Sequence, residues 1–553
     1  MKLCQFIFIV LLTVSVQLSA NTNTVAVASA HPLATQAGLE ILEQGGNAFD
    51  AAVAVTATLA VVEPASSGLG GGAFWLLHQA DTETDVMIDG REMAPGKASA
   101  DMYLNKQGQF EQDLSLDGPL AAGIPGVPAG MVHLSETYGK LPLSASLAPA
   151  IRIALNGFEV SERYQHLAQF RLDKLNAYPA SRRQFLDNGQ LPPLGYLIRQ
   201  PDLAHTLNLL ARNGQAGFYQ GETAQRLVTA VTKNGGIWTL DDLKRYQIKE
   251  RQPITGHYHG YQITSAALPS SGGIVLVNAL NQLSAFDLSH ADINQRRHLI
   301  IEAMRRAYRD RSVYLGDADF VETPAFLTSM EYAKTLSDSI DLFKATPSED
   351  IKSPKIDGED TTHFSIIDAR GNRVAATLSV NYPFGSGFVA EGTGVLLNDE
   401  MDDFAPPAGA ANVYGLVGNA ANAVAPYKRP LSSMSPTFFE NDDRILITGT
   451  PGGSRIISMV LLSILDFVDE ESAEQIVAAP RYHHQYLPDH VEIEKDSFSA
   501  SDIKALEQRG HNIKQLNRQY GDMHIIIVDK NQNKVSAASD PRGEGEAVVK
   551  SLP

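Results

Sequence analysis

The hydrophobic pattern of the chain changes along its length. Between residues 142 and 343, apolar residues recur every three or four positions, which is typical of amphipathic helices. Glycines follow several of these segments, at positions where helices commonly end. The pattern therefore predicts a mainly helical region, with helices at residues 143–156, 202–213, 222–233, 271–283 and 294–309.

From residue 361 onward, polar and apolar residues alternate as they do in half-buried strands. Segments 363–368 and 373–380 flank a short turn-forming stretch, and we expect them to form a hairpin. Further strands are predicted at 445–448, 490–494, 523–529 and 535–539, and further helices at 454–467, 473–479 and 501–509.

Two helices and a strand are expected near the start of the chain. Residues 32–43 have helical spacing, and residues 51–62 are so apolar that their helix should be buried. Residues 68–73 match a glycine-rich dinucleotide-binding fingerprint, but that motif needs a strand before it and a helix after it. Here the helix comes first and a strand at 73–78 follows, so we interpret the glycines as a tight turn.

The composition of the 553 residues is that of an ordinary globular protein, with 44% hydrophobic and 20% charged residues. The formal net charge of −18 argues against nucleic acid or an anionic membrane as a partner. These numbers allow a large core and exclude a polyanion-binding protein.

The N-terminus has the features of a targeting segment. Lys2 is followed by an apolar run at residues 6–16, which is too short to span a membrane, and Ser19 and Ala20 offer a cleavage site. We therefore expect residues 1–20 to be a signal peptide and the protein to be exported, periplasmic or secreted. A retained anchor is the alternative. Cys4, the only cysteine, lies inside this segment, so the mature protein would have no disulfide.

Two groups of residues suggest a binding site but have simpler explanations. The basic run at 305–311 alternates with acidic and aromatic residues, and we expect it to be a solvated helix face. His483, His484 and His490 lack the spacing and acidic partner of a known zinc-ligand set, which favours structural histidines and no metal site.

Thr361 begins the strand-rich region and follows a polar, turn-prone segment at 353–360. Attack of its hydroxyl on the carbonyl carbon of Asp360 would convert the peptide into an ester, and water would then release a chain that starts at Thr361. Such a residue combines a nucleophile with an α-amine that can accept its proton near neutral pH. A Thr-Thr-His sequence at a strand start is by itself ordinary β-structure, so the rest of the chain must decide.

Six further sequence blocks closely resemble the γ-glutamyltransferase family of the N-terminal-nucleophile hydrolases, and they occur in the order that the family has. They are residues 45–52, 67–72, 91–95, 398–404, 429–436 and 450–455, and the resemblance extends from about residue 26 to residue 542. It implies an α+β fold, a four-layer αββα sandwich, and no cofactor. Cleavage between Asp360 and Thr361 would give a large subunit of residues 21–360 and a small subunit of residues 361–553 that share one core.

The activity implied by the resemblance is the cleavage of γ-glutamyl amides such as glutathione through an ester on Thr361. The acyl group would pass to water or to an amino acid or peptide. Arg91 matches the family arginine that holds the α-carboxylate of the donor, and a guanidinium suits this because it binds carboxylates bidentately. Ser432 and Ser433 match serines that hydrogen-bond the same end of the donor.

The resemblance assigns the remaining site residues as well. Asn381, Glu400 and Asp403 match positions around the α-amine, where carboxylates can pair with the ammonium. Amides of Gly452 and Gly453 match the oxyanion hole, in which a side chain would obstruct the developing oxyanion. The last two matches are Ser379, which could hydrogen-bond Thr361, and Tyr414, in a lid at 405–427 that favours small donors.

Two other interpretations stay open. An enzyme of the same fold could use another acyl donor, as cephalosporin acylases and capsule-polymer transferases do. Asp403 and the lid argue against this, because the related acylases tend to have asparagine where their acyl group lacks the α-amine. An exported amino-acid-binding protein without catalysis is the second alternative, and it would need neither Thr361 nor a cut.

Overall fold

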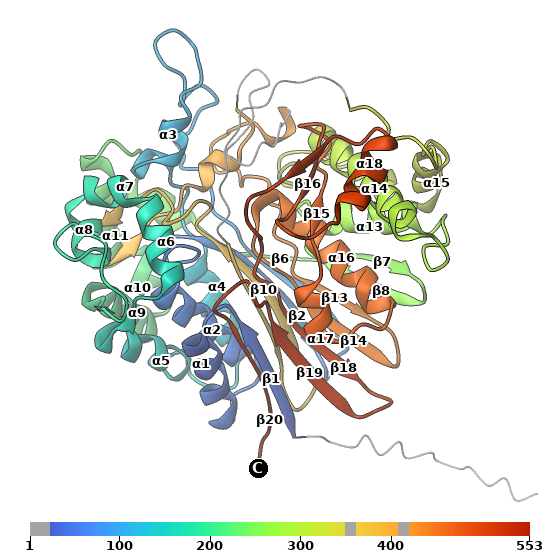
Figure 1. The fold of residues 1–553 in the computed structure, drawn as a ribbon. Coiled ribbons are helices and arrows are strands. Elements are labelled where there is room, and N and C mark those ends of the chain that lie inside the picture. The colour runs from blue at the N-terminus through green and yellow to red at the C-terminus, as the bar shows by residue number, and fades with distance from the viewer. Residues whose placement is uncertain (1–22, 349–360, 407–419) are drawn as a thin grey trace, which may run out of the picture.

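Two β-sheets face each other in the computed structural model, and helices cover the outer face of each sheet (Figure 1). The structure describes residues 23–348, 361–406 and 420–553. Neighbouring strands within both large sheets are antiparallel. The four-layer αββα sandwich predicted from the sequence is therefore confirmed.

The two large sheets take strands from both sides of the 349–360 gap. The seven-stranded sheet has the order β20 (Glu546–Ser551), β1 (Thr24–Ser29), β9 (Thr362–Ile367), β10 (Arg373–Ser379), β2 (Gly72–Gln79), β3 (Thr84–Gly90) and β6 (Lys249–Arg251). The six-stranded sheet has the order β19 (Lys534–Ser539), β18 (His524–Asp529), β14 (Arg444–Thr448), β13 (Thr437–Glu440), β8 (Tyr261–Ser265) and β7 (Ile254–Tyr258).

Three smaller sheets lie outside this sandwich. They are the pair β4 (Phe158–Glu159) and β5 (Leu197–Ile198), the pair β11 (Val389–Ala390) and β12 (Val395–Leu396), and the three strands β15 (Tyr482–His483), β16 (Val491–Ile493) and β17 (Ile513–Gln515).

Side-chain alternation in the strands separates the two cores of the sandwich. On β1, Val25 and Val27 pack in a core with the helices that cover the seven-stranded sheet. Ala26 and Ala28 point to the other face and join the core between the sheets. The central strands β1, β9, β10 and β2 are thus buried on both faces, and the first core contains residues from before and after the gap. Both parts of the chain contribute to this first core, and the division into two subunits that share one core stays a prediction.

The helices divide between the two outer layers. Those before β6 are α1 (Pro32–Glu43), α2 (Ala48–Val62), α3 (Gln112–Leu116), α4 (Val127–His133), α5 (Leu143–Asn156), α6 (Glu162–Phe170), α7 (Leu172–Ala177), α8 (Pro179–Phe185), α9 (Pro201–Asn213), α10 (Ala216–Tyr219), α11 (Gly221–Lys233) and α12 (Leu240–Arg245). Those after β8 are α13 (Gly272–Leu283), α14 (Ile293–Tyr314), α15 (Met330–Asp338), α16 (Ile456–Val468), α17 (Ala473–Ala478) and α18 (Ala500–Gln508).

Helix α2 shows how local sequence fixes an element. All of its residues are buried, as its composition predicts. The helix begins at Ala48, three residues earlier than predicted, because Asn47 and Asp50 form a reciprocal capping box. Gly68 to Gly71 follow the helix and precede β2, so the order of elements excludes the dinucleotide motif as expected.

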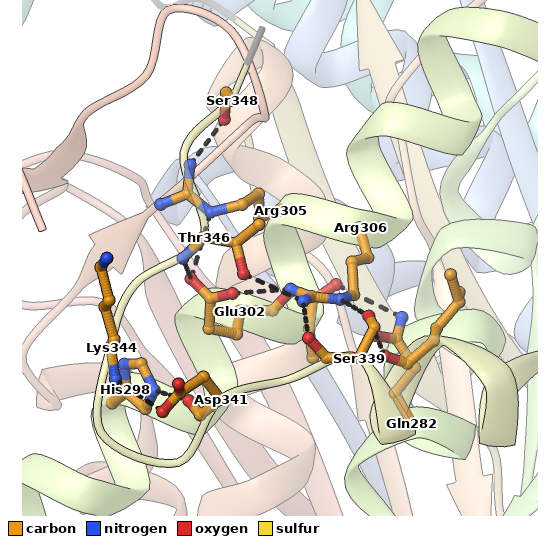
Figure 2. Close-up of polar contacts among 12 residues, drawn as sticks. Gln282, His298, Glu302, Arg305, Arg306, Ser339, Asp341, Lys344, Thr346 and Ser348 are labelled. Atoms are coloured by element: carbon orange, nitrogen blue, oxygen red, sulfur yellow. Dashed lines mark hydrogen bonds and ion pairs between the residues drawn. The ribbon is translucent and has the colours of Figure 1, made fainter. Parts of the chain in front are cut away.

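The expectation for the basic run at 305–311 is wrong in part. Arg305 and Arg306 are buried, and both donate hydrogen bonds to the fully buried Glu302 on the same helix, α14 (Figure 2). Arg306 also binds the hydroxyl and carbonyl oxygens of Ser339. Segment 339–348 folds back over α14 and supplies these oxygens, and a local sequence pattern cannot reveal a partner that lies far along the chain.

Charged groups from the C-terminal part of the chain complete this contact. Arg305 contacts Ser348 and the carboxylate of Asp489, and Asp489 also accepts a hydrogen bond from the Ser348 amide. Ser348, the last described residue before the 349–360 gap, is therefore held by Arg305 from before the gap and by Asp489 from after it.

Replacing Glu302 with alanine tests how much this network stabilises the fold. Removing one member of a buried ion pair leaves its partners as uncompensated charges, which typically costs about 3–5 kcal/mol. We expect Glu302→Ala to lower the free energy of unfolding by roughly 3 kcal/mol, measured by denaturant titration, and to open segment 339–348 to limited proteolysis. Lys334→Ala is the control, because it removes an exposed ion pair with Asp338 and should change neither property. Equal behaviour of the two variants would contradict a stabilising role for Glu302.

Candidate active site

Thr361 lies at the start of β9, between strands β1 and β10, and is 3% exposed. The last paired residues of β9 and β10 are Thr362 and Leu378. One residue further, the same antiparallel register sets Thr361 opposite Ser379. Side chains alternate along a strand, so Thr361 and Thr362 point to opposite faces of the sheet.

A single cavity brings most of the predicted site residues together. Its volume is about 300 Å³, including its opening to solvent. The predicted residues that line it are Arg91, Thr361, Ser379, Asn381, Glu400, Asp403, Ser432, Ser433 and Gly453, and Met434, Ser454 and Ile456 complete the wall. Gly452 does not line the cavity itself but is the residue directly before Gly453. Asp360 and Tyr414 lie outside the described residues.

Arg91 is the central charged group of the cavity and is almost completely buried. Its two terminal nitrogens donate to Glu400 at 2.6 Å and to Asp403 at 2.5 Å. A third carboxylate, that of Glu92, lies 3.5 Å from the same guanidinium. One cation therefore faces three carboxylates, which leaves the site with an excess of negative charge.

The excess charge perturbs the carboxylates. Burial raises the pKa of Glu400 to about 7, although the charge of Arg91 opposes this shift. Burial and the neighbouring Glu400 raise the pKa of Glu92 well above its usual value. Glu400 Oε2 and Glu92 Oε1 are buried without a hydrogen-bond partner among the described residues. A cationic group entering the cavity would supply the missing partner and counter-charge.

The end of β3 holds Arg91 in place. Asp89, fully buried, accepts a hydrogen bond from the Arg91 amide at 3.0 Å and forms ion pairs with Arg251 and Arg429. The Arg91 Nε donates to the carbonyl of Pro430, and Tyr246 donates its hydroxyl to the Arg91 carbonyl. The guanidinium is thus aimed by contacts from several segments rather than by its strand alone.

Turns that follow β10 position Asn381, Glu400 and Asp403. Asn381 has a φ of 75°, in the left-handed region that asparagine tolerates better than most residues. Its amide donates to Ser379 Oγ at 2.8 Å, and its side chain donates to the carbonyl of Asp399. Glu400 and Asp403 follow on a 3₁₀ turn. The backbone thereby carries Asn381 and both carboxylates to the same end of the cavity.

Gly452 and Gly453 lie at the N-terminal end of the helical segment that continues into α16. Their φ angles of 137° and 55° are in the region that favours glycine. A Cβ on Gly452 would also approach the Met459 methyl group to 2.6 Å. Amides at a helix start carry partial positive charge, which suits an oxyanion.

The serine pair is supported from α13 and α14. Ser271 donates its backbone amide and its hydroxyl to the Ser432 carbonyl. Arg311 on α14 donates to Ser271 Oγ at 2.9 Å and to Ser433 Oγ at 3.2 Å. Sequence reasoning missed Arg311, which it assigned to solvent, and Glu92, although Glu92 lies within a matching block beside Arg91.

The histidines singled out from the sequence do not line this cavity. His483 is buried and hydrogen-bonds Ser458 and Gln485, and burial lowers its pKa to about 3. His484 contacts Asp489 at 3.3 Å. No group of three or more potential metal-ligating side chains occurs within the described residues.

Comparison with known proteins gives consistent matches along the chain. Residues 34–550 match the family described as Gamma-glutamyltranspeptidase. The glutathione hydrolase proenzyme of Escherichia coli (strain K12) is 43% identical over 528 residues, which are 93% of this chain and 90% of that protein. Cephalosporin acylase from Bacillus halodurans superposes with a TM-score of 0.85 at 28% identity, covering 95% of this chain and 96% of the acylase. Helicobacter pylori gamma-glutamyltranspeptidase has 44% identity and a TM-score of 0.56 over 58% of this chain and 92% of that chain.

The αββα sandwich and its structural neighbours define an enzyme of the N-terminal-nucleophile hydrolase class. Within this class, the chain belongs to the gamma-glutamyltranspeptidase family, whose chemistry is the hydrolysis and transfer of γ-glutamyl groups. The family resemblance and the enzyme class predicted from the sequence are confirmed.

Glu400→Gln tests the charge balance of the cavity. The folded-state pKa of Glu400 is raised, so its contribution to stability is present below pH 4.5 and is lost as the pH rises towards 7. Glutamine does not carry this cost. We therefore compare the free energy of unfolding of the variant with that of the native protein at two pH values. We expect this difference to be about 2 kcal/mol more in favour of the variant at pH 8 than at pH 5. Denaturant titrations at both pH values measure this change.

Glu391→Gln makes the same chemical change at an exposed ion pair and separates the effect of burial. A difference between Glu400→Gln and the native protein that does not vary with pH would show that the three-carboxylate cluster is not strained by its charge.

Proposed function

We propose that the chain is a self-processing glutathione hydrolase and γ-glutamyltransferase with Thr361 as its nucleophile. The observation that carries this proposal is the single cavity that joins Thr361 to Arg91 and to the carboxylates around it. Relatives that share most of their length with the chain are named glutathione hydrolase proenzymes, which supports both the donor and the processing.

Processing would occur between Asp360 and Thr361. The Thr361 hydroxyl attacks the Asp360 carbonyl carbon, the peptide C–N bond breaks, and the resulting ester is hydrolysed by water. The products are a large subunit ending at Asp360 and a small subunit whose first residue carries a free α-amine. Because β9 is held between β1 and β10, the new N-terminus stays in the cavity.

The donor's α-amino-acid group fits the charges of the cavity. Its carboxylate would pair with Arg91 and with the hydroxyls of Ser432 and Ser433. Its ammonium would take the place beside Glu400, Asp403 and Asn381, where Arg91 alone now balances the negative charge. A zwitterion therefore exchanges one set of ion pairs for another and leaves the net charge of the cavity unchanged.

Acyl transfer then follows from the position of Thr361. Its α-amine takes the hydroxyl proton as the oxygen attacks the γ-carbonyl carbon, and amides of Gly452 and Gly453 stabilise the oxyanion. The C–N bond breaks, the leaving amine takes the proton, and a γ-glutamyl ester remains on Thr361. Water or the amine of an amino acid or peptide attacks this ester and restores the enzyme. Ser379, opposite Thr361 in the sheet, would orient the nucleophile.

A second candidate is an acylase for donors without an α-amine, which the extensive similarity to cephalosporin acylase favours. Two observations weigh against it. A donor with a carboxylate but no ammonium would add negative charge to a cavity that already has an excess. It would also leave the buried Glu400 Oε2 without a partner.

Export is part of the proposal because residues 1–20 have the features of a signal peptide. That segment lies outside the described residues. Within the described ranges, no helix combines the length and apolar character needed to cross a bilayer.

Thr361→Ala tests processing. Because one hydroxyl serves cleavage and catalysis, we expect a single uncut chain on a denaturing gel and no hydrolysis of a γ-glutamyl anilide. Thr362→Ala is the matched control, since that side chain points to the opposite face of the sheet, and it should still give two bands. Two bands from Thr361→Ala would disprove the mechanism.

Asp403→Asn tests the donor pocket by removing one charge without changing the size of the side chain. Losing part of a buried charge pair typically costs about 2–5 kcal/mol, and the retained hydrogen bond and Glu400 place this substitution near the lower end. We expect kcat/KM for a γ-glutamyl anilide to fall at least tenfold while processing remains intact. A glutaryl anilide, which lacks the amine, should lose little or gain.

The ratio of the two kcat/KM values is the measurement, because it cancels general damage to the fold. Equal losses on both donors would mean that Asp403 has only a structural role.

A further inference from the structure

Arg311 is a buried cation whose contacts differ from those of the other buried arginines. It is 5% exposed, and its hydrogen bonds go to the hydroxyls of Ser271 and Ser433. Among the described residues, no carboxylate lies within ion-pair distance of it. Every other buried arginine of the described residues has such a partner, namely Arg91, Arg171, Arg305, Arg306, Arg373, Arg429, Arg455 and Arg481.

A buried guanidinium without a counter-ion is costly, because burial removes its hydration and nothing replaces the lost charge interaction. The Asp403 carboxylate attracts Arg311 only beyond ion-pair distance, and the positive charge of Arg91 repels it. Arg311 therefore lacks a counter-anion at ion-pair distance among the described residues. It is hydrogen-bonded to Ser433, which lines the candidate active-site cavity.

We propose that Arg311 is a second cation for the α-carboxylate of the γ-glutamyl donor and that it acts through Ser433 as a positioning residue. This inference rests on the proposed function, because it requires a donor carboxylate beside Ser432 and Ser433. Arg91 is already shared by Glu400 and Asp403, whereas the charge of Arg311 is not divided among carboxylates.

The hydrogen-bond directions explain how the effect is transmitted. A guanidinium can only donate, so Ser433 Oγ accepts from Arg311 and its own hydrogen is free to point into the cavity. The neighbouring cation polarises this hydroxyl and makes it a stronger donor to a carboxylate. The second bond of Arg311 orients Ser271, whose hydroxyl donates to the Ser432 carbonyl. This second bond reaches only the backbone of Ser432, whereas Arg311 contacts the Ser433 hydroxyl directly.

Three donors separate this role from a general structural one. A γ-glutamyl anilide has both the carboxylate and the ammonium, a glutaryl anilide has only the carboxylate, and a 4-aminobutyryl anilide has only the ammonium. For Arg311→Gln we expect KM to rise at least tenfold for the first two donors with kcat changed less than threefold. For the 4-aminobutyryl anilide, kcat/KM should stay within threefold of the native value.

A double-mutant comparison provides a second measurement on the γ-glutamyl anilide alone. If Arg311 acts through Ser433, adding Arg311→Gln to Ser433→Ala should change kcat/KM by less than threefold. Multiplicative losses in the double variant would overturn the proposal, as would equal losses on all three donors.

Two further variants keep the test decisive. Arg309→Gln is the matched control on the same helix, because Arg309 is about half exposed, and it should have native kinetics. If Arg311→Gln fails to fold or to process, Arg311→Lys retains the charge but cannot span both serines. It should then raise KM several-fold for carboxylate donors only, and a donor-independent effect would overturn the proposal. A native enzyme that does not cleave the γ-glutamyl anilide would instead refute the proposed function.

Discussion

The pairing of β9 with β1 on one side and β10 on the other is the constraint on which the rest of the structure depends. It places β9, which begins just after Thr361, between β1 from the start of the chain and β10, which directly follows β9. The same pairing creates one core from residues on both sides of the 349–360 gap. Because β9 is fully buried on both faces, Thr361 has one fixed position, at the strand end and on the cavity wall. A cut before Thr361 would leave this arrangement intact.

Electrostatic imbalance is the main physical feature of the cavity. A site with Arg91 beside three carboxylates is not arranged for stability, because burying excess charge costs free energy and raises the pKa values of Glu92 and Glu400. That cost is recovered when a ligand supplies an ammonium. Arg311, which has no ion-pair partner among the described residues and is bonded to Ser433, makes the complementary demand for an anion. Together they describe a site that is completed by a zwitterion.

Helix α14 connects the site to the stability of the fold. The middle of the helix holds segment 339–348 through Glu302, Arg305 and Arg306 (Figure 2). About one turn and a half beyond Arg306, the same helix presents Arg311 to Ser433. Each of these charged side chains is buried, so the helix has a narrow tolerance for polar substitutions. The anchoring of segment 339–348 and the contact to Ser433 thus depend on the same helix.

The sequence by itself determined the elements with strong periodicity, because hydrophobic spacing and capping are local properties. Its resemblance to a known family implied the αββα fold. Helix α2 and the β9–β10 hairpin appeared almost where the pattern placed them. It also named the candidate residues from Arg91 to Gly453 that line one cavity. Only the tertiary structure decided that Arg91 lies beside three carboxylates and that Arg305, Arg306 and Arg311 on α14 are buried. Those outcomes depend on contacts such as Arg91 with Glu400 and Arg305 with Asp489, which join distant parts of the chain. The partner of a charged residue cannot be known until the fold brings its neighbours together.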